Sequence, residues 1–320
     1  PSAELTVFNN AVSAYETASI ENVRVKALSD ATKLATDANK AIADLTKATA
    51  DLTKAQGMQT QLDSADALRH TRAVQLSLLI SGVAWASHLA AQQLTPDFVS
   101  GLSIGAFPAA VVAGALDFTD ALRLVALRGE LMEQAYPQGY GLTAIIGLTQ
   151  YQLEPLLGDS FLANINDRLQ MVVAGSEQAM AATAQRALAA GAQKAQRLAV
   201  SVPSHCALLQ QPAEKLAAAF SSVSVKRPRV AYLSGSTGRV IWQPERIVQD
   251  LAFNMANTVR WHEAMGAANE RDVGLALEMP PGAVLTGLTR KTLCRGEALS
   301  LEQGGVDLAL KLAQRLRVSA

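Results

Sequence analysis

The chain has 320 residues, of which 49% are hydrophobic, so it is long enough to bury a large core in one big domain or two smaller ones. Its 28 basic and 28 acidic residues give a formal net charge of zero, which argues against a nucleic-acid partner, and the apolar content argues against a disordered chain. The two cysteines, Cys206 and Cys294, lie outside any C-x-x-C pattern. We therefore expect no metal site, no disulfide framework and a reducing compartment.

Residues 1–62 form an atypical, helical N-terminal region that is rich in Ala, Thr, Asp and Lys. Apolar residues recur every seven positions from Leu28 to Leu52, which predicts an amphipathic helix or helix pair with a thin, Ala-rich seam. Residues 5–8, before this pattern, are compatible with one short strand. Residues 1–30 lack the apolar run of a signal peptide, so we expect a cytoplasmic protein.

Residues 63–137 alternate between helix and strand. A helix is predicted over Thr71–Ala91, and polar residues such as Gln75 interrupt its apolar run. Spanning a membrane takes about 20 mostly apolar residues, so we interpret this segment as a buried helix and expect no membrane association. A short strand, Phe98–Ser100, precedes an Ala- and Val-rich helix, and residues 117–134 form a further amphipathic helix.

Residues 138–202 are predicted to form a unit of their own. The segments read strand, helix, strand, strand, helix, strand, and Ser176 stands where it would cap the second helix. This order is that of a small ferredoxin-like module. We interpret the module as an insertion, because the segments on either side of it look like two parts of one α/β domain.

Residues 203–320 resume the alternation of helix and strand. Strands are predicted at 230–233 and 273–277, with helices at 213–220, 244–255 and 306–316. Strands separated by helices indicate a largely parallel sheet with both faces covered. The predicted fold is therefore an α/β-hydrolase-like core, made of residues 1–137 and 203–320, that carries the ferredoxin-like insert.

The sequence G-L-S-I-G at residues 101–105 lies between a predicted strand and a predicted helix. In this setting G-x-S-x-G is the nucleophile-elbow arrangement, in which a sharp turn lifts the serine hydroxyl, here that of Ser103, off the edge of the sheet. The following helix directs its N-terminus at the site, so backbone N–H groups are available to stabilise an oxyanion. The five-residue pattern is weak by itself and gains weight from this context.

A nucleophilic serine needs a base, and the chain contains four histidines. His205 follows the sequence V-P-S at the junction that leaves the predicted insert, where Pro203 restricts the backbone. His205 is therefore a candidate general base, and a helix-capping segment is the alternative interpretation. The histidines at positions 70, 88 and 262 lie in or beside helical stretches and have no comparable setting.

Three further segments accompany the elbow: L-R-G-E-L-M at 127–132, V-P-S-H-C-A-L at 202–208 and E-M-P-P-G-A-V-L-T-G-L at 278–288. Together, in this order and spacing, they resemble malonyl-CoA:acyl-carrier-protein transacylases. Leu102 and the run I-G-A-F-P after Ser103 are more similar to the malonyltransferase subunit of bacterial malonate decarboxylase. The usual fatty-acid enzyme has His in place of Leu102 and Glu in place of Ala106.

The resemblance implies roles for the matching residues. Ser103 would be the acylated nucleophile, and His205 would be its general base and later its general acid. Arg128 would pair with the free carboxylate of malonate, a task that suits a guanidinium fork. The family orients its histidine with a main-chain carbonyl, and the match of N-T-V-R-W at 257–261 implies that Arg260 supplies this carbonyl.

Other implied features concern binding. The backbone N–H of Ile104 would be one oxyanion donor, and Asn164 and Asn166 are similar to polar residues that line the family's site. The substrate would be malonyl-CoA, the acceptor an acyl carrier protein or carrier subunit, and no cofactor is implied. The resemblance does not separate fatty-acid synthesis from malonate breakdown.

The N-terminus departs from the family pattern, which has a strand followed by F-P-G-Q-G, whose Gln helps to form the oxyanion hole. Here the sequence N-N-A-V at 9–12 follows the predicted strand, and loss of one oxyanion donor typically costs about 10²–10³ in rate. Three hypotheses therefore stay open: a malonyltransferase, a serine thioesterase or esterase of related architecture, and an impaired, non-catalytic partner subunit.

Overall fold

The computed structural model describes residues 70–136 and 138–319. The helices and the short strand predicted within residues 1–62 lie outside these ranges. The helices are α3 (Thr71–Ala91), α4 (Ala106–Val112), α5 (Phe118–Ala135), α6 (Gln150–Leu153), α7 (Glu177–Ala189), α8 (Gln210–Ala219), α9 (Pro244–Phe253), α10 (Trp261–Asn269), α11 (Val284–Arg290) and α12 (Leu301–Ser319). The strands are β1 (Phe98–Ser100), β2 (Tyr140–Ile146), β3 (Phe161–Asp167), β4 (Gln170–Ser176), β5 (Lys194–Arg197), β6 (Ala231–Leu233), β7 (Val240–Ile241), β8 (Leu275–Glu278) and β9 (Glu297–Ser300).

Short sheets and surrounding helices make up the core. β1 and β6 pair in parallel, and β7 adds to β6 in the antiparallel direction, so this sheet is mixed. β8 and β9 form a separate parallel pair. The largest apolar cluster joins the helices around β1 and β6, and each of five helices contributes a fully buried side chain: Leu79, Phe107, Val125, Leu216 and Leu251. Burial of each such side chain contributes about 1.5–3 kcal/mol.

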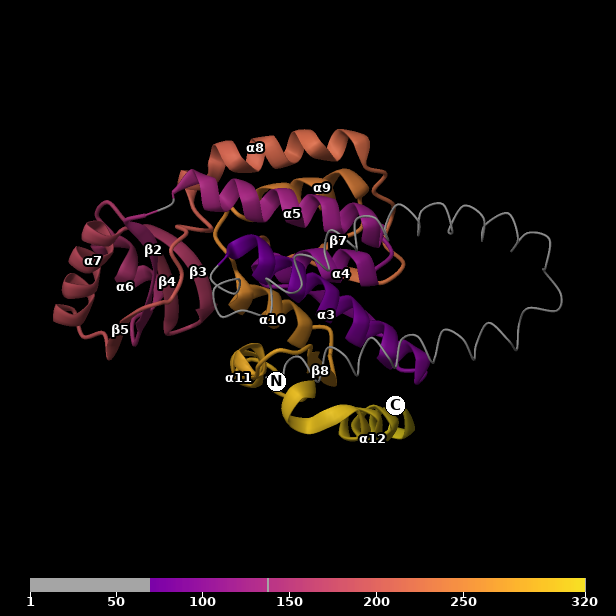
Figure 1. Ribbon diagram of the computed structural model, residues 1–320. Coiled ribbons are helices and arrows are strands. Elements are labelled where there is room, and N and C mark those ends of the chain that lie inside the picture. Colours follow the sequence, from indigo (N-terminus) through magenta and orange to yellow (C-terminus); the bar gives the residue numbers. More distant parts are fainter. Residues whose placement is uncertain (1–69, 137, 320) are drawn as a thin grey trace, which may run out of the picture.

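α3 is the one described helix that is long and apolar enough to cross a membrane. It packs against α4 and α5 (Figure 1), and its Leu79 belongs to the core cluster. A core helix passes the same test of length and composition, and the described contacts of α3 bury Ala73, Gln75, Leu79 and Leu89.

β2 to β5 form an antiparallel sheet in the order β3-β4-β2-β5, which projects from one side of the core with α7 beside it (Figure 1). The segment order is the predicted βαββαβ, so the ferredoxin-like insert is confirmed. Its own apolar cluster includes Ile145, Met171 and Met180. Ser176 caps α7 as predicted, since its hydroxyl accepts a hydrogen bond from the Ala179 N–H at 3.2 Å. The limits 138 and 202 stay predictions.

The edge strand β3 ties the insert to the core. The Ile165 N–H donates to the Val259 carbonyl at 2.7 Å, and the Val259 N–H donates to the Ala163 carbonyl at 2.9 Å. At the end of the strand, Asp167 forms an ion pair with Lys291 at 2.9 Å. The chain between α9 and α10 therefore extends the inserted sheet, and it holds the insert against the part of the core that carries the candidate site.

Candidate active site

Ser103 stands at the turn between β1 and α4, in a short 3-10 helix over Ser103–Gly105. Its φ angle is +55°, a left-handed conformation that costs a non-glycine residue free energy and that clusters at functional sites. This is the geometry predicted for a nucleophile elbow. The turn places the serine hydroxyl at the start of the helical segment that continues into α4.

The two glycines of the elbow differ in their steric role. A Cβ atom on Gly101 would lie 1.9 Å from the Gly105 carbonyl carbon and 2.2 Å from the Ala106 nitrogen. A Cβ atom on Gly105 would meet nothing within 4 Å. Steric contact therefore restricts position 101 to glycine, whereas position 105 has room for a side chain.

This difference gives a matched pair of variants. Gly101→Ala is expected to lower the free energy of unfolding by about 3 kcal/mol or more, because backbone atoms must move to admit the methyl group. Gly105→Ala should change it by less than about 1 kcal/mol. Denaturant titrations of both variants measure the difference. Equal stabilities would show that the elbow is not closed as described.

His205 lies beside the serine and is 3% exposed. Its Nε2 is 2.9 Å from the Ser103 Oγ, and its Nδ1 is 2.7 Å from the Asn254 carbonyl oxygen. A carbonyl can only accept, so Nδ1 carries the proton and Nε2 is free to accept the serine hydroxyl hydrogen. The structure thus brings the predicted base to the predicted nucleophile in the tautomer that base catalysis needs.

The carbonyl that orients His205 belongs to Asn254, so the prediction that Arg260 supplies it is wrong. Asn254 caps the C-terminus of α9, where the last carbonyls have no partners within the helix. Asn254 offers its carbonyl to the imidazole, and the Met255 carbonyl accepts from the His205 backbone N–H at 2.6 Å. The end of a predicted helix, where carbonyls lack partners within the helix, is the sequence feature that indicates this acceptor.

The contacts of Arg260 belong to the fold rather than to the candidate site. It is the N-cap residue of α10, and its carbonyl accepts the Ala264 N–H at 3.0 Å as a hydrogen bond of that helix. Its N–H donates to the Gly235 carbonyl at 2.7 Å. Its guanidinium pairs with Glu263 at 2.6 Å on the surface. The Arg260 carbonyl therefore serves the first turn of α10, and the hydrogen bond to His205 Nδ1 goes to Asn254.

Arg128, on α5, is the largest fully buried side chain among the described residues. Its Nη2 donates to the Ser103 Oγ at 3.2 Å and to the Asn254 Oδ1 at 3.0 Å, and its Nη1 donates to the Gln75 Oε1 at 2.5 Å. Its Nε has no partner in the described part of the chain. Burial lowers the pKa of Arg128, because the acceptors around it there are neutral and only partly replace the lost water.

Sequence reasoning missed Gln75 and Asn254 as site residues. Gln75 lies on α3 and is 5% exposed, and its position as a polar residue within an apolar run was the available signal, because a buried amide needs a partner. The Asn254 side chain also donates to the Ser103 carbonyl at 3.3 Å. Asn254 therefore contacts the nucleophile, the base and the arginine.

The remaining predicted site residues lie at two places. Ile104 follows Ser103 in the 3-10 helix and is buried. Asn164 and Asn166 lie on β3, and Asn164 bridges to Val259. The side-chain oxygens of both asparagines are buried without a hydrogen-bond partner in residues 70–136 and 138–319. Within those ranges neither asparagine bonds to Ser103, His205 or Arg128.

The environment of His205 determines how the rate of serine acylation should depend on pH. Burial, and secondly the positive charge of Arg128, lower the pKa of His205 to about 4. A general base must be neutral, and histidine is neutral above its pKa, so serine acylation should rise as pH passes through about 4 and stay constant to neutral pH. The pH profile of kcat/KM, taken after brief pH jumps, measures this limb. A limb near pH 6.5, the ordinary value, would contradict it.

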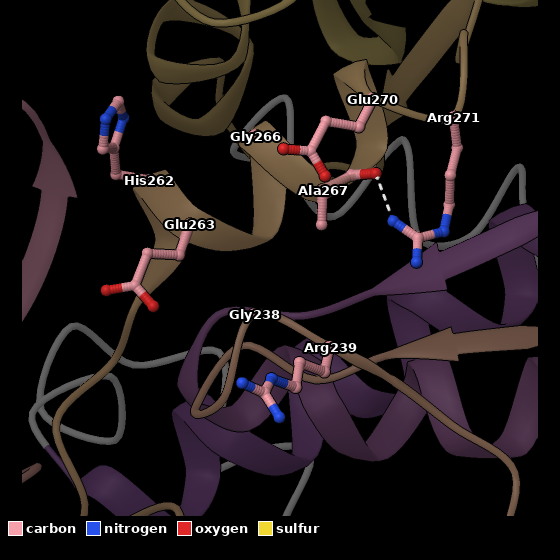
Figure 2. Close-up of a pocket in the computed structure, with 8 residues that line it drawn as sticks. All are labelled: Gly238, Arg239, His262, Glu263, Gly266, Ala267, Glu270 and Arg271. Carbon is pink, nitrogen blue, oxygen red and sulfur yellow. Dashed lines mark hydrogen bonds between the residues drawn. The ribbon is translucent and has the colours of Figure 1, made fainter.

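A hollow with a volume of about 440 Å³ lies between α10 and the turn that joins β6 to β7, and Figure 2 shows the residues that line it. Arg239 extends from this turn across from Glu263, Glu270 and Arg271 of the α10 side. The lining carries both signs of charge and includes none of Ser103, His205 and Arg128. We assign this hollow no part in the chemistry.

Comparisons with known proteins give a consistent result. A family model described as an acyl transferase domain matches residues 25–304. A malonyl CoA-acyl carrier protein transacylase from Haemophilus influenzae is 34% identical over 252 residues, which are 75% of this chain and 80% of that protein. An acyl carrier protein S-malonyltransferase from Vibrio cholerae has a TM-score of 0.71 at 32% identity and covers 74% of this chain and 80% of its own. A malonyl-transacylase in complex with its type II PKS acyl-carrier protein has a TM-score of 0.74 at 32% identity, with coverages of 79% and 84%.

The fold and the comparisons define an acyltransferase of the α/β class with mixed sheets. The chain belongs to the acyl transferase domain family and, within it, to the malonyl-CoA:acyl-carrier-protein transacylases.

Proposed function

We propose that the protein transfers a malonyl group from malonyl-CoA to the thiol of an acyl carrier protein, through an ester on Ser103. One observation supports the malonyl specificity above all: the Arg128 Nη2 lies 3.2 Å from the Ser103 Oγ. Only one methylene separates the two carbonyl carbons of malonate. A cation that binds the free carboxylate must therefore lie next to the nucleophile that attacks the thioester, as Arg128 does.

The reaction would run in two halves. Ser103 attacks the thioester carbonyl while His205 Nε2 takes the hydroxyl proton, and the Asn254 carbonyl stabilises the resulting imidazolium through Nδ1–H. The tetrahedral intermediate collapses, the C–S bond breaks, and the imidazolium returns the proton to the sulfur of coenzyme A. The carrier thiol then attacks the ester, with His205 as base, and the serine leaves with the proton.

Further roles are proposed for the binding residues. The Ile104 N–H, at the start of the helical segment that leads into α4, is an oxyanion donor, supported by the helix N-terminus behind it. Asn164 and Asn166 bind polar groups of the substrate, supported by their buried and unpartnered side-chain oxygens. The neutral partners of Arg128 favour a substrate that brings its own carboxylate.

The partner in this proposal is an acyl carrier protein, as in the solved complex of a type II PKS carrier with its malonyl-transacylase. A carrier subunit of malonate decarboxylase is the second candidate, suggested by Leu102 and the residues after Ser103. We place the reaction in the cytoplasm, and the two free cysteines, Cys206 and Cys294, are consistent with a reducing compartment.

One assay separates this proposal from the two alternatives. The protein is incubated with malonyl-CoA and a holo carrier protein, and malonyl-carrier, free malonate and coenzyme A are measured together. A transferase forms malonyl-carrier faster than malonate. Malonate formed faster than malonyl-carrier would indicate a thioesterase, and release of no coenzyme A would indicate a non-catalytic subunit.

A further inference from the structure

A buried carboxylate that the proposed mechanism does not use lies behind the site. Asp250, on α9 one helical turn before Asn254, is 7% exposed. Its Oδ2 accepts a hydrogen bond from the Tyr232 hydroxyl at 2.7 Å, and its Oδ1 accepts one from the Ser234 hydroxyl at 2.6 Å. Within residues 70–136 and 138–319 none of the groups that bond to it is a cation. Burial of an unpaired carboxylate costs free energy, which points to a task other than stability.

Two of the hydroxyls that bind Asp250 come from β6, the strand next to the nucleophile's strand, and from the residue that follows it; the Ser236 side chain also bonds to the carboxylate. Tyr232 lies on β6, opposite Val99 of β1 in the parallel pair, and Ser234 follows β6 directly. The two strands are further joined by the Ser100 hydroxyl, which donates to the Leu233 carbonyl at 2.8 Å. The strand that leads into the elbow and the strand that binds Asp250 therefore form one unit.

Through its backbone, Asp250 is also connected to Asn254, the residue whose carbonyl orients His205. Its backbone carbonyl accepts the Asn254 N–H at 2.9 Å. Asn254 in turn binds the His205 Nδ1 at 2.7 Å, the Arg128 Nη2 at 3.0 Å and the Ser103 carbonyl at 3.3 Å. The Asp250 side chain thus joins the last turn of α9, which supports His205, to β6, which lies beside the strand that carries Ser103.

We propose that Asp250 is a positioning residue for the transfer reaction. By accepting from Tyr232 and Ser234, it holds the end of α9 so that the Asn254 carbonyl stays within reach of His205 Nδ1. Without that carbonyl, the tautomer with its proton on Nε2 competes, and this tautomer cannot accept the serine proton. The catalytic consequence rests on the function proposed above.

Asp250→Ala tests the proposal, with Asp250→Asn as the conservative variant. The alanine variant should lower kcat by about 10²-fold, as expected for a misplacement near 1 Å, with little change in KM. Asn should restore most of the rate, because its Oδ1 accepts from Ser234 and its Nδ2 donates to the Tyr232 oxygen. Gln249→Ala, at an exposed position of the same helix, is the matched control and should have the unmodified rate.

A second readout does not depend on activity. The His205 Nδ1–H, hydrogen-bonded to a carbonyl, should give a low-field proton NMR signal that His205→Gln removes. This signal should shift or disappear in Asp250→Ala and be present in Asp250→Asn. If the unmodified protein forms no malonyl-serine, the proposed function fails while this signal still decides the role of Asp250.

Two results would overturn the inference: a folded Asp250→Ala variant with an unchanged rate and imidazole signal, or an Asn variant as impaired as the Ala variant. If Asp250→Ala does not fold, Tyr232→Phe removes one of the hydrogen bonds to Asp250 at nearly constant volume. It should give a smaller loss, about tenfold for one hydrogen bond, with the same change of signal. No change in either measurement would contradict the role of Asp250.

Discussion

Ser103→Ala should abolish malonyl labelling of the protein and lower malonyl transfer by about 10⁴-fold or more, because removal of a nucleophile disables a catalytic group that acts as a unit. The hydroxyl is the one side-chain oxygen that the His205 Nε2 reaches among the described residues, at 2.9 Å. Transfer is measured with malonyl-CoA and a holo carrier protein.

The matched control for this substitution is Ser222→Ala, which removes an exposed hydroxyl whose one partner in the described part of the chain is the Ala219 carbonyl. It should transfer malonyl at the unmodified rate. The Ser103 variant should keep its fold, since a methyl side chain fits wherever a hydroxymethyl side chain does. Transfer by a folded Ser103→Ala variant at more than a tenth of the original rate would mean that another group carries the acyl chain.

Arg128→Ala is expected to reduce malonyl acylation far more than acetyl acylation. Removal of one partner from a buried, hydrogen-bonded charge pair costs about 2–5 kcal/mol, which corresponds to a roughly 30- to 5,000-fold loss for the donor that carries a carboxylate. Acetyl-CoA has no group for the guanidinium to bind, so its slower acylation should change much less. The measured quantity is the ratio of kcat/KM for the two donors.

Three variants define the cause of that loss. Arg128→Lys keeps the charge and loses the fork, so it should retain part of the malonyl preference. Arg128→Gln keeps a hydrogen-bonding group without charge and should behave like the alanine variant. Arg123→Ala, which removes an exposed arginine of the same helix, should leave the ratio unchanged. Equal losses for both donors in Arg128→Ala would show that Arg128 serves the fold alone.

Much of the site could be predicted because its side chains have distinctive settings. The serine stands between glycines at a change from strand to helix, and the structure shows why Gly101 is needed there: any Cβ would collide with the backbone of Gly105. His205 follows Pro203 in the chain between β5 and α8, a setting that no other histidine of the sequence has, and its φ is +66°. The role of Arg128 rests on the family resemblance, because a buried arginine and a surface arginine cannot be distinguished in the sequence of an amphipathic helix.

The missed features have physical reasons of their own. The acceptor for His205 Nδ1 is a backbone carbonyl, and every residue has one, so only the end of α9 distinguishes Asn254. β7 has two residues, too few for an alternating pattern to emerge, and the last three residues of β9 are all buried, so its sequence does not alternate. Within α12 the backbone of Gly305 is not helical (φ +73°, ψ 169°), so the helix is interrupted there. The part after Gly305 agrees with the helix predicted at 306–316, and only the short helical segment before it was not predicted.

The most direct test is the mass of the Ser103 peptide after separate incubations with malonyl-CoA and acetyl-CoA. We expect a malonyl adduct on this peptide, formed much faster than the acetyl adduct, and its removal when a holo carrier protein is added. An unlabelled Ser103 peptide, or equal labelling by the two donors, would contradict a serine nucleophile paired with a carboxylate-binding arginine.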